Sequence, residues 1–535
     1  MNTKLYSAFL AVILVAILSI LYFFVPDGSN SVSDEQIESS EASSSTETII
    51  KEQPRVISIE TPESNQLGSI YQIWLRSFYD ANNDGHGDIA GVIKKFDYIK
   101  ALNPKTILLN PIFDSPSVHG YDPTNYLEIH PHFGNKTQFK QLIKLCEEAN
   151  INLWLDLPFN HTSQYHPWFK QSLKQQAPYT NYYVWQQTMP KGYGLPWSDE
   201  ENSQAVWHSK SEREGFYYGV FGYGNPDLNY NNPLVIAEMQ QVLKHWIELG
   251  VTGFRVDAAR YLAEEGGGKL QRDTQSNHAA LAQLISFSKS INPNVEFVGE
   301  TFTSMENSQP YLSHSQLDGV YNFEYFSSVR DLFESNINAQ ASIIDIYKRL
   351  AQYIQNDKSA YIFLSNHDID RVSATDNIKR ILAAITILSP FDISVYYGEE
   401  LGLEQYKQDQ DLYRRATMLW SLDIKTNGGF NQGQLPWVDQ AQYVPWLATF
   451  EPWTQAFLAE SSTSANQAEQ NTESLLHLYR QLMALKKHDK VFPRGGRLDI
   501  YTNNSKVWLV RYSNNQGTRW LIQNLDAENS TLASI

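Results

Sequence analysis

Eight short hydrophobic runs that alternate with amphipathic segments constrain the fold more than any other feature of this sequence. The runs are rich in β-branched and aromatic side chains, as buried strands are. They cover residues 69–75, 106–109, 152–156, 253–257, 295–300, 319–323, 361–365 and 392–397. Between them, segments such as 233–249 and 377–388 have the apolar spacing of a helix. Eight such alternations predict a (β/α)8 TIM barrel rather than a doubly wound sheet.

Four of these runs end on a carboxylate or lead directly to one. The acids are Asp156, Asp257, Glu300 and Asp368, in this order along the chain. The carboxyl ends of all strands in a parallel barrel face one rim, where such enzymes keep their chemistry. We therefore expect the four acids to gather at one rim, an arrangement that suggests a glycosidase.

Composition excludes some partners and favours others. The net charge of -17 argues against a nucleic-acid partner, whose phosphates would be repelled. The 13 Trp, 31 Tyr and 25 Phe suit a protein that stacks rings on sugars, although ordinary core anchors account for most of them. The single cysteine, Cys146, excludes an internal disulfide.

The N-terminus has the character of a membrane anchor. Residues 5–25 are uncharged and mostly apolar after Lys4, and this stretch is long enough to span a bilayer. It ends in aromatic residues before Pro26 and lacks a small-residue cleavage site. The pattern favours an uncleaved anchor at residues 1–26, with the rest of the chain outside the cytoplasmic membrane. Secretion after signal cleavage is the alternative.

The remaining chain divides into three predicted parts. Residues 27–65 are Ser-rich and carry nine acids against two basic residues, which predicts a disordered acidic linker. The catalytic barrel is expected over 66–487. It includes an inserted subdomain at 162–232, because the connection after the third strand is far longer than a normal loop. Alternating strand patterns predict a short C-terminal β domain at 488–535.

At its acid-bearing segments the chain closely resembles the alpha-amylase family of glycoside hydrolases, and bacterial membrane-associated alpha-amylases in particular. The likeness runs from about Ser69 to Arg494. The segments that carry it, in family order, are His119–Asp122, Asp156–His161, Asn225–Asn229, Gly253–Arg260, Phe297–Glu300, Ser365–Asp368 and Tyr396–Glu400.

Retaining cleavage of a glycosidic bond needs a nucleophilic carboxylate and a protonated acid, roughly 5–5.5 Å apart. By position, Asp257 is the nucleophile and Glu300 the acid/base. Arg255 lies two residues before Asp257 on the same face of the strand, so its charge is expected to keep Asp257 ionised. Glu300 has to carry a proton, which burial and the negative neighbours Asp257 and Asp368 favour.

The resemblance also implies how the sugar is held. Asp368 would grip sugar hydroxyls and help to distort the ring, without donating a proton. His161 and His367 would hydrogen-bond the sugar beside the cleaved bond, and Tyr121 would stack under it. Asp156 would hold the end of its strand.

Two calcium sites are expected. The loop 80–88 offers oxygen ligands at alternate positions, as a hard cation needs. Gly91 in the twelfth position excludes an EF-hand, and a polar loop without metal is the alternative. The resemblance implies a second site beside the inserted subdomain. The first-loop ligands would be Asp80, Asn82, Asp84, Asp88 and the main chain of His86, and those of the second site Asn160 and Asp227.

The resemblance implies hydrolysis of α-1,4-glucosidic bonds in starch-like polysaccharides or maltooligosaccharides through a covalent glycosyl-enzyme. Asp122 and Arg415, which is adjacent to Arg414, are also similar to a pair that closes the cleft in exo-acting relatives. An exo-acting alpha-glucosidase or oligo-1,6-glucosidase therefore stays open. Some members of this fold are non-catalytic partners of transporters, but they have lost catalytic acids that this chain keeps.

Overall fold

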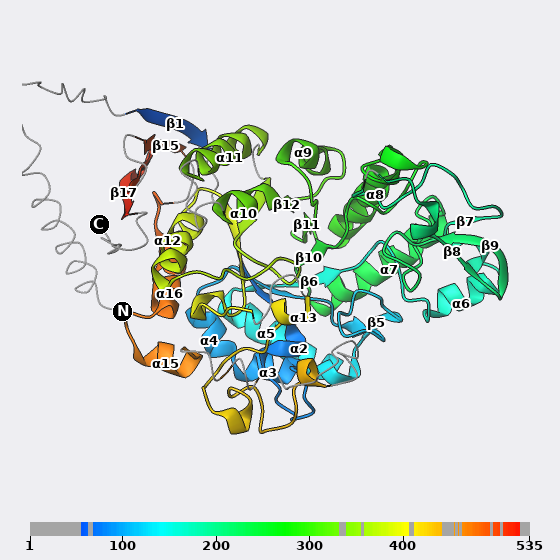
Figure 1. The fold of residues 1–535 in the computed structure, drawn as a ribbon, viewed down its shortest axis with the longest axis horizontal. Helices are drawn as coiled ribbons and strands as arrows, with labels where there is room; N and C mark the ends of the chain where they lie inside the picture. Colours follow the sequence, from blue (N-terminus) through cyan, green and yellow to red (C-terminus); the bar gives the residue numbers. More distant parts are fainter. Residues whose placement is uncertain are drawn as a thin grey trace, which may run out of the picture. The chain divides into compact units, whose positions relative to one another are not determined.

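The structure is a computed structural model (Figure 1), and it forms two units, residues 62–495 and a smaller one from both ends of the chain. The predicted anchor, 1–26, lies outside the described residues, as does most of the predicted linker. Within the described part, no helix is long and apolar enough to cross a membrane. The structure describes residues 55–61, 68–198, 200–330, 339–354, 358–405, 411–440, 454, 458, 463–492, 496–502 and 507–524.

A closed barrel of eight parallel strands organises the larger unit. Pairing of the last strand with the first closes it, through partners such as Ser394 and Ile70. All eight predicted runs are barrel strands, so the predicted fold class is confirmed. In barrel order the strands are β2 (Ser69–Ile73), β3 (Thr106–Leu109), β6 (Asn152–Leu157), β10 (Gly253–Val256), β11 (Glu296–Gly299), β12 (Gly319–Tyr321), β13 (Ser359–Phe363) and β14 (Asp392–Tyr396).

Helices between the strands complete the barrel. The sequence sets the bounds of α7: Asn232 caps its first turn, Pro233 opens it, and Gly250 ends it in the left-handed conformation with φ of 113°. Both α7 and α12 match the predicted helices within one residue. The main helices are α3 (Ile89–Lys94), α4 (Phe96–Ala101), α5 (Lys136–Ala149), α7 (Pro233–Leu249), α8 (Gln275–Ile291), α9 (Met305–Ser313), α10 (Phe323–Arg330), α11 (Ala339–Tyr353), α12 (Asp376–Ile387) and α16 (Leu475–His488).

Large side chains fill the barrel interior. Trp154 is fully buried there and packs in one cluster with Tyr321 and Phe363. Its bulk requires a glycine on the neighbouring strand, because a Cβ at Gly253 would lie 2.4 Å from the Trp154 indole nitrogen. Small and large residues are thus matched across β6 and β10, as close packing demands.

The connection after β6 holds the inserted subdomain, as predicted. Its three-stranded antiparallel sheet has the order β7-β9-β8, and Figure 1 shows it at the right. A small core of its own contains Val206, Trp207, Tyr218 and Val220. The elements are α6 (Pro167–Leu173), β7 (Trp185–Gln186), β8 (Trp207–Lys210) and β9 (Arg213–Tyr218), and a separate β4 (Phe113–Asp114) and β5 (Asn125–Ile129) pair precedes them.

The smaller unit is a four-stranded antiparallel sheet with the order β1-β15-β16-β17. Its C-terminal strands agree with the predicted β domain. Residues 56–61, for which the composition predicts disordered linker, instead form β1, which pairs with β15. The acidic composition around them hid a short alternation that buries Ile59 and Thr61. The strands are β1 (Val56–Thr61), β15 (Gly496–Tyr501), β16 (Val507–Asn514) and β17 (Gly517–Asn524).

We predict that Gly253→Ala lowers the free energy of unfolding by about 1–3 kcal/mol, because the added methyl group overpacks the barrel against Trp154. Gly224→Ala is the matched control, since the nearest atom to a Cβ there is 3.9 Å away. The urea midpoint of both variants measures the effect. Equal midpoints would show that the barrel accommodates the methyl group.

Candidate active site

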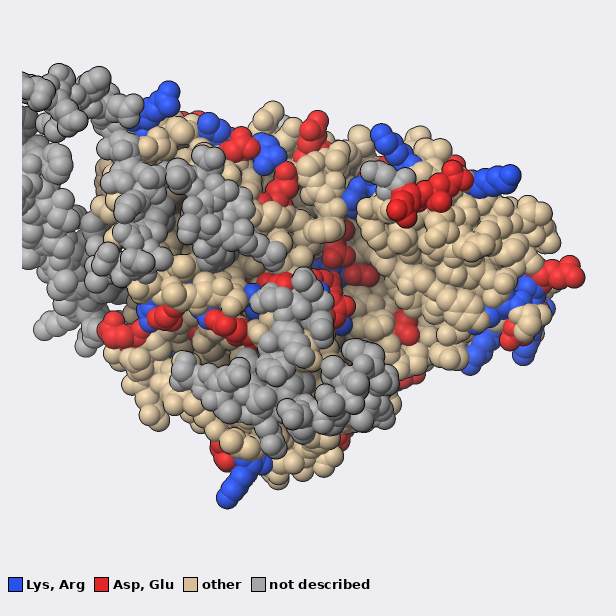
Figure 2. Space-filling view, in the orientation of Figure 1, with Lys and Arg blue, Asp and Glu red and all other residues tan. Residues whose placement is uncertain are grey.

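A single buried guanidinium joins the acids at the barrel rim. Arg255 Nη1 lies 2.8 Å from Asp156 Oδ1 and 2.6 Å from Asp257 Oδ1, and Nη2 lies 2.8 Å from Glu300 Oε1. The main-chain N–H of Ala258 donates to the second oxygen of Glu300 at 3.1 Å. Figure 2 shows acidic side chains gathered in a hollow near the centre of this face. The structure thus brings the predicted nucleophile and acid/base to one space.

Burial controls the ionisation of Asp257. It raises the pKa of Asp257 well above the usual range; Arg255 opposes this shift, while negative charges on Glu300 and Asp156 add to it. The charge of Arg255 thus acts on Asp257 in the direction expected from the sequence, but burial has the larger effect on the pKa. When Glu300 carries the proton, one of the opposing charges disappears and Arg255 acts on Asp257 with less competition.

Asp368 has the opposite environment. Its oxygens pair with His367 Nε2 at 2.9 Å and with Arg415 Nη2 at 2.9 Å. Desolvation disfavours the charge, but His367, Arg415 and Arg255 outweigh it and hold the pKa of Asp368 well below its ordinary value. Its side chain is 43% exposed, so this carboxylate reaches solvent in its ionised form.

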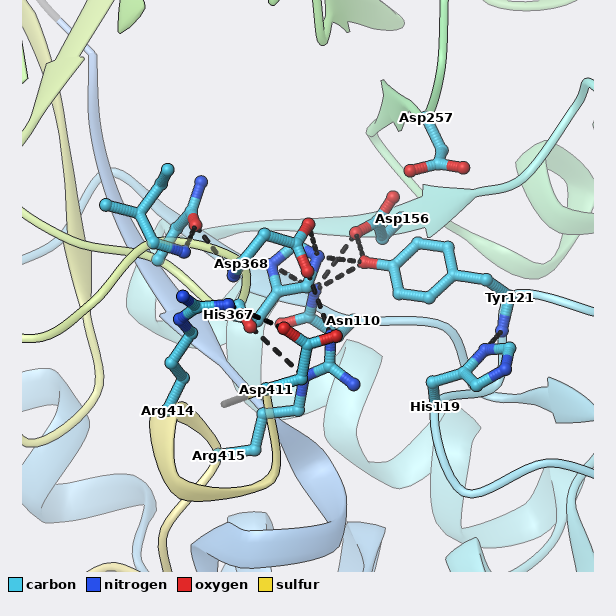
Figure 3. Close-up of polar contacts among 12 residues, drawn as sticks. Asn110, His119, Tyr121, Asp156, Asp257, His367, Asp368, Asp411, Arg414 and Arg415 are labelled. Atoms are coloured by element: carbon cyan, nitrogen blue, oxygen red, sulfur yellow. Dashed lines mark hydrogen bonds and ion pairs between the residues drawn. The ribbon is translucent and has the colours of Figure 1, made fainter. Parts of the chain in front are cut away.

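Tyr121 lies beside Asp156 and His367 in the site (Figure 3). Its hydroxyl donates to Asp156 Oδ2 at 2.6 Å and contacts His367 Nε2 at 2.6 Å. The rings of Tyr121 and His367 stack with centroids 5.4 Å apart. The same oxygen of Asp156 also accepts from Asn110 at 3.0 Å. These contacts fix a flat ring beside the acids, and its role under a sugar stays a prediction.

His161 lies nearby with both ring nitrogens buried and without a hydrogen-bond partner among the described residues. Burial lowers its pKa to about 3, so the ring is neutral near pH 7. A neutral imidazole can donate one hydrogen bond and accept another. The hydrogen bonds of His161 to a sugar stay a prediction.

The structure does not join Asp122 to Arg415. Asp122 is buried and accepts hydrogen bonds from the hydroxyls of Ser115 and Ser117. Arg415 instead contacts Asp368 and, at 3.6 Å, Asp411. Asp122 and Arg415, which resemble the cleft-closing pair of exo-acting relatives in sequence, therefore have separate partners.

The predicted first-loop calcium ligands contact their own loop. Asp80 accepts from the main-chain N–H groups of Asn83, Asp84 and Gly85, and Asp88 accepts from Ala81, Asn82 and Gly91. Asn82 accepts from Asp84, Asp84 accepts from His86, and the other Asp84 oxygen pairs with His132. Within the described residues, no three His, Cys, Asp or Glu side chains are grouped to hold a metal ion. These are the contacts of the metal-free Asx-turn alternative, so calcium in this loop stays a prediction.

The second predicted calcium pair has unsatisfied oxygens. Asn160 is fully buried, and among the described residues neither its amide oxygen nor its nitrogen makes a hydrogen bond of good geometry. Asp227 Oδ2 also makes none there, although the Asn160 side chain interacts with Asp227 and lowers its pKa. Burial raises the pKa of Asp227 well above its usual range. A buried amide and carboxylate oxygen with free lone pairs fit a hard cation. These residues would hold the ion where the inserted subdomain meets the barrel.

Some site residues escaped the sequence reasoning. Asn110 follows the last residue of β3, so the rule that found the acids could have found it too. Gln72 donates to His367 Nδ1 at 3.0 Å. The Trp74 ring stacks on His367 at 5.6 Å and lies 4.5 Å from the Arg415 guanidinium. No local signal distinguishes Gln72 or Trp74 from ordinary core residues.

A parallel barrel with paired acids at its carboxyl rim is the arrangement expected of a glycoside hydrolase. Residues 72–495 match the alpha amylase catalytic domain, and the chain belongs to the alpha-amylase family. It is 36% identical over 364 residues to Alpha-amylase 3 of Dictyoglomus thermophilum, covering 66% of this chain and 68% of that protein. It is 26% identical over 490 residues to oligo-1,6-glucosidase of Bacillus cereus, covering 82% and 87%. The crystal structure of alpha-amylase from H. orenii superposes with a TM-score of 0.71 at 29% identity, covering 86% and 90%.

We predict that Asp156→Asn moves the acidic limb of the kcat/KM–pH profile to lower pH. Asp257 attacks only when ionised, so activity falls as pH drops through its pKa, which burial and Asp156 raise. Removing the charge of Asp156 lowers that pKa and frees Arg255 for Asp257. Asp97→Asn, on an exposed helix surface, should leave the limb in place. An unchanged or upward-shifted limb in Asp156→Asn would contradict this coupling.

Proposed function

We propose that this glycoside hydrolase cleaves α-1,4-glucosidic bonds of starch-like polysaccharides or maltooligosaccharides with retention of configuration. The observation that carries the proposal is the pairing of Asp257 and Glu300 with the two Nη atoms of Arg255. Contact with one guanidinium brings the two carboxyl groups close together, which supports the short separation of a retaining pair.

The proposed reaction has two steps. In the first step, Asp257 attacks the anomeric carbon and the bond between that carbon and the leaving oxygen breaks. Glu300 gives the leaving oxygen a proton. The sugar is then an ester of Asp257. In the second step Glu300 takes a proton from water, whose oxygen attacks the same carbon and releases Asp257.

The remaining side chains act on the sugar beside the broken bond. The ionised Asp368 accepts hydrogen bonds from ring hydroxyls and stabilises the positive charge that develops at the anomeric carbon. His367 and Arg415 keep Asp368 charged through the contacts described above. Tyr121 offers its flat face, and the free nitrogens of His161 take two further hydroxyl contacts.

The separate partners of Asp122 and Arg415 favour cleavage within a chain over exo action. A closed end would require these side chains to meet across the cleft, and instead Asp122 bonds to Ser115 and Ser117. The second candidate, an exo-acting alpha-glucosidase or oligo-1,6-glucosidase, is supported by the similarity to the Bacillus cereus enzyme.

We further propose that calcium binds Asn160 and Asp227, and that the N-terminal segment anchors the enzyme outside the cytoplasmic membrane. The unsatisfied oxygens support the first proposal. The positive charge of the ion would link the loop after β6, which contains Asn160, to the end of the inserted subdomain, which contains Asp227. The apolar stretch at residues 5–25 supports the second, and an enzyme at that location would meet external α-glucan.

We predict that Glu300→Gln lowers kcat on soluble starch by roughly a hundredfold to ten-thousandfold, because the amide cannot protonate the leaving oxygen. Glu296→Gln is the matched control: the same change at the opposite end of β11, where Glu296 lies 3.9 Å from Lys105. Far-ultraviolet circular dichroism checks the fold of both variants. Full activity in folded Glu300→Gln would remove Glu300 from the mechanism.

The reaction products show which glucosidic bond is cleaved and whether cleavage occurs within a chain or at its end. We expect the full chain, given soluble starch, to lower its viscosity quickly and to release oligosaccharides that are initially α-configured by NMR. Maltose and isomaltose should react slowly. Initial β-configured products would exclude a retaining mechanism, and glucose released only from the short substrates would favour the exo-acting candidate.

We predict that calcium raises the thermal midpoint and that Asp227→Asn abolishes this response. At a hundred times its Kd, a ligand of the folded state contributes about 2.7 kcal/mol. Asp84→Asn in the first loop should keep the response to calcium after treatment with EDTA. A response lost in Asp84→Asn and kept in Asp227→Asn would place the ion in the first loop instead.

A further inference from the structure

A cavity lies at the end of the barrel opposite the catalytic acids. Its volume is about 640 Å³, within the range of sites that hold small molecules. Residues at the amino ends of the barrel strands line it: Ser69 opens β2, Asn152 opens β6 and Glu296 opens β11. Asp257 and Glu300 follow the carboxyl ends of β10 and β11, so this cavity is separate from the candidate active site. It lies wholly within the larger unit.

The cavity gathers positive charge in a chain whose net charge is -17. Four lysines line it, against the two carboxyl groups of Glu296 and Asp318. Even when the buried Asp392 near Lys486 is counted, the cations outnumber the acids by four to three. A hollow lined mainly by one sign of charge attracts ions of the opposite sign. The lysines are Lys105, Lys289, Lys486 and Lys487.

Two of these lysines differ in how closely an acid matches their charge. Lys289 Nζ pairs with Asp318 Oδ1 at 2.5 Å. Lys105 Nζ, in contrast, is 3.9 Å from Glu296 Oε1, which is too long for a hydrogen bond. The Lys105 side chain is only 28% exposed, so burial removes part of its hydration. This loose pairing leaves N–H donors of Lys105 for a ligand.

Lys486 is held rigidly in the wall of the cavity. It is only 3% exposed, and its Nζ donates to the main-chain carbonyls of Phe391 at 2.6 Å and Ser389 at 3.1 Å. An ammonium group has three N–H donors, and these two contacts within the described residues use two of them. A buried cation is costly unless an opposite charge and further hydrogen bonds compensate it. An anion in the cavity would provide both.

The uncharged part of the lining is also polar. It includes the amide groups of Asn150, Asn152, Asn292 and Asn294. None of the described residues that line the cavity is aromatic, so it lacks the flat faces that suit a bare sugar ring. Amide groups can both donate hydrogen bonds to hydroxyl groups and accept them. The lining therefore suits a ligand that carries hydroxyl groups as well as negative charge.

We propose that this cavity binds a small phosphate ester of a polyol, with the phosphate on the lysines and the hydroxyl groups on the asparagines and Glu296. A phosphate monoester carries a charge of about -1.5 to -2 at pH 7, which matches the excess of four lysines over two lining acids. The amino end of a parallel barrel serves stability rather than catalysis. A ligand that bridges several strand ends there stabilises the folded barrel.

The test measures binding of glycerol 3-phosphate to the full chain by isothermal titration calorimetry at constant ionic strength. We expect the phosphate ester to bind and to raise the thermal midpoint, and glycerol at the same concentration to do neither. Lys105→Gln and Lys487→Gln should each raise the Kd roughly tenfold, because each removes a charged hydrogen-bond donor. The measurement does not depend on catalysis, so it is independent of the proposed function.

Lys136→Gln is the matched control. Lys136 opens α5, and Asn150 at the cavity caps the other end of this helix, about 20 Å away. The control should keep the wild-type Kd. A wild type that binds no glycerol 3-phosphate, or that binds glycerol equally well, would overturn the proposal.

An unchanged Kd in both Lys105→Gln and Lys487→Gln would place the ligand elsewhere and would also overturn the proposal. Far-ultraviolet circular dichroism checks that each variant is folded. If one variant does not fold, the other variant and the wild type still decide the outcome.

Discussion

The active site depends on one buried charge, the guanidinium of Arg255. It contacts three carboxylates that come from three adjacent strands, and its side chain is only 4% exposed. Strand register makes this possible, because Arg255 lies opposite Asp156 on β6 and beside Val298 on β11. Without that cation, three buried negative charges would repel one another, and this repulsion would strongly destabilise the fold.

The same network separates the roles of the acids. Burial and the negative charges of its neighbours raise the pKa of Asp257. The two basic partners of Asp368, His367 and Arg415, lower the pKa of Asp368. Different environments thus give carboxylates of one type different protonation behaviour. The barrel supplies the positions, and the neighbours of each side chain supply its chemistry.

The inserted subdomain gives one side of the barrel rim features that the other side lacks. Its end lies against the loop after β6, where Leu228 donates to the carbonyl of Asn160 at 2.9 Å. The unsatisfied oxygens of Asn160 and Asp227 lie at this junction, and the exposed Trp197 projects from the same subdomain.

The sequence by itself determined the barrel, its strand positions and the acids at its rim, because hydrophobic periodicity and strand ends are local properties. It could not reveal that Asp122 and Arg415 have separate partners, that the loop acids of 80–88 contact their own main chain, or that residues 56–61 form a strand. These features depend on contacts between residues far apart in the chain, and only the tertiary structure decides which side chains meet.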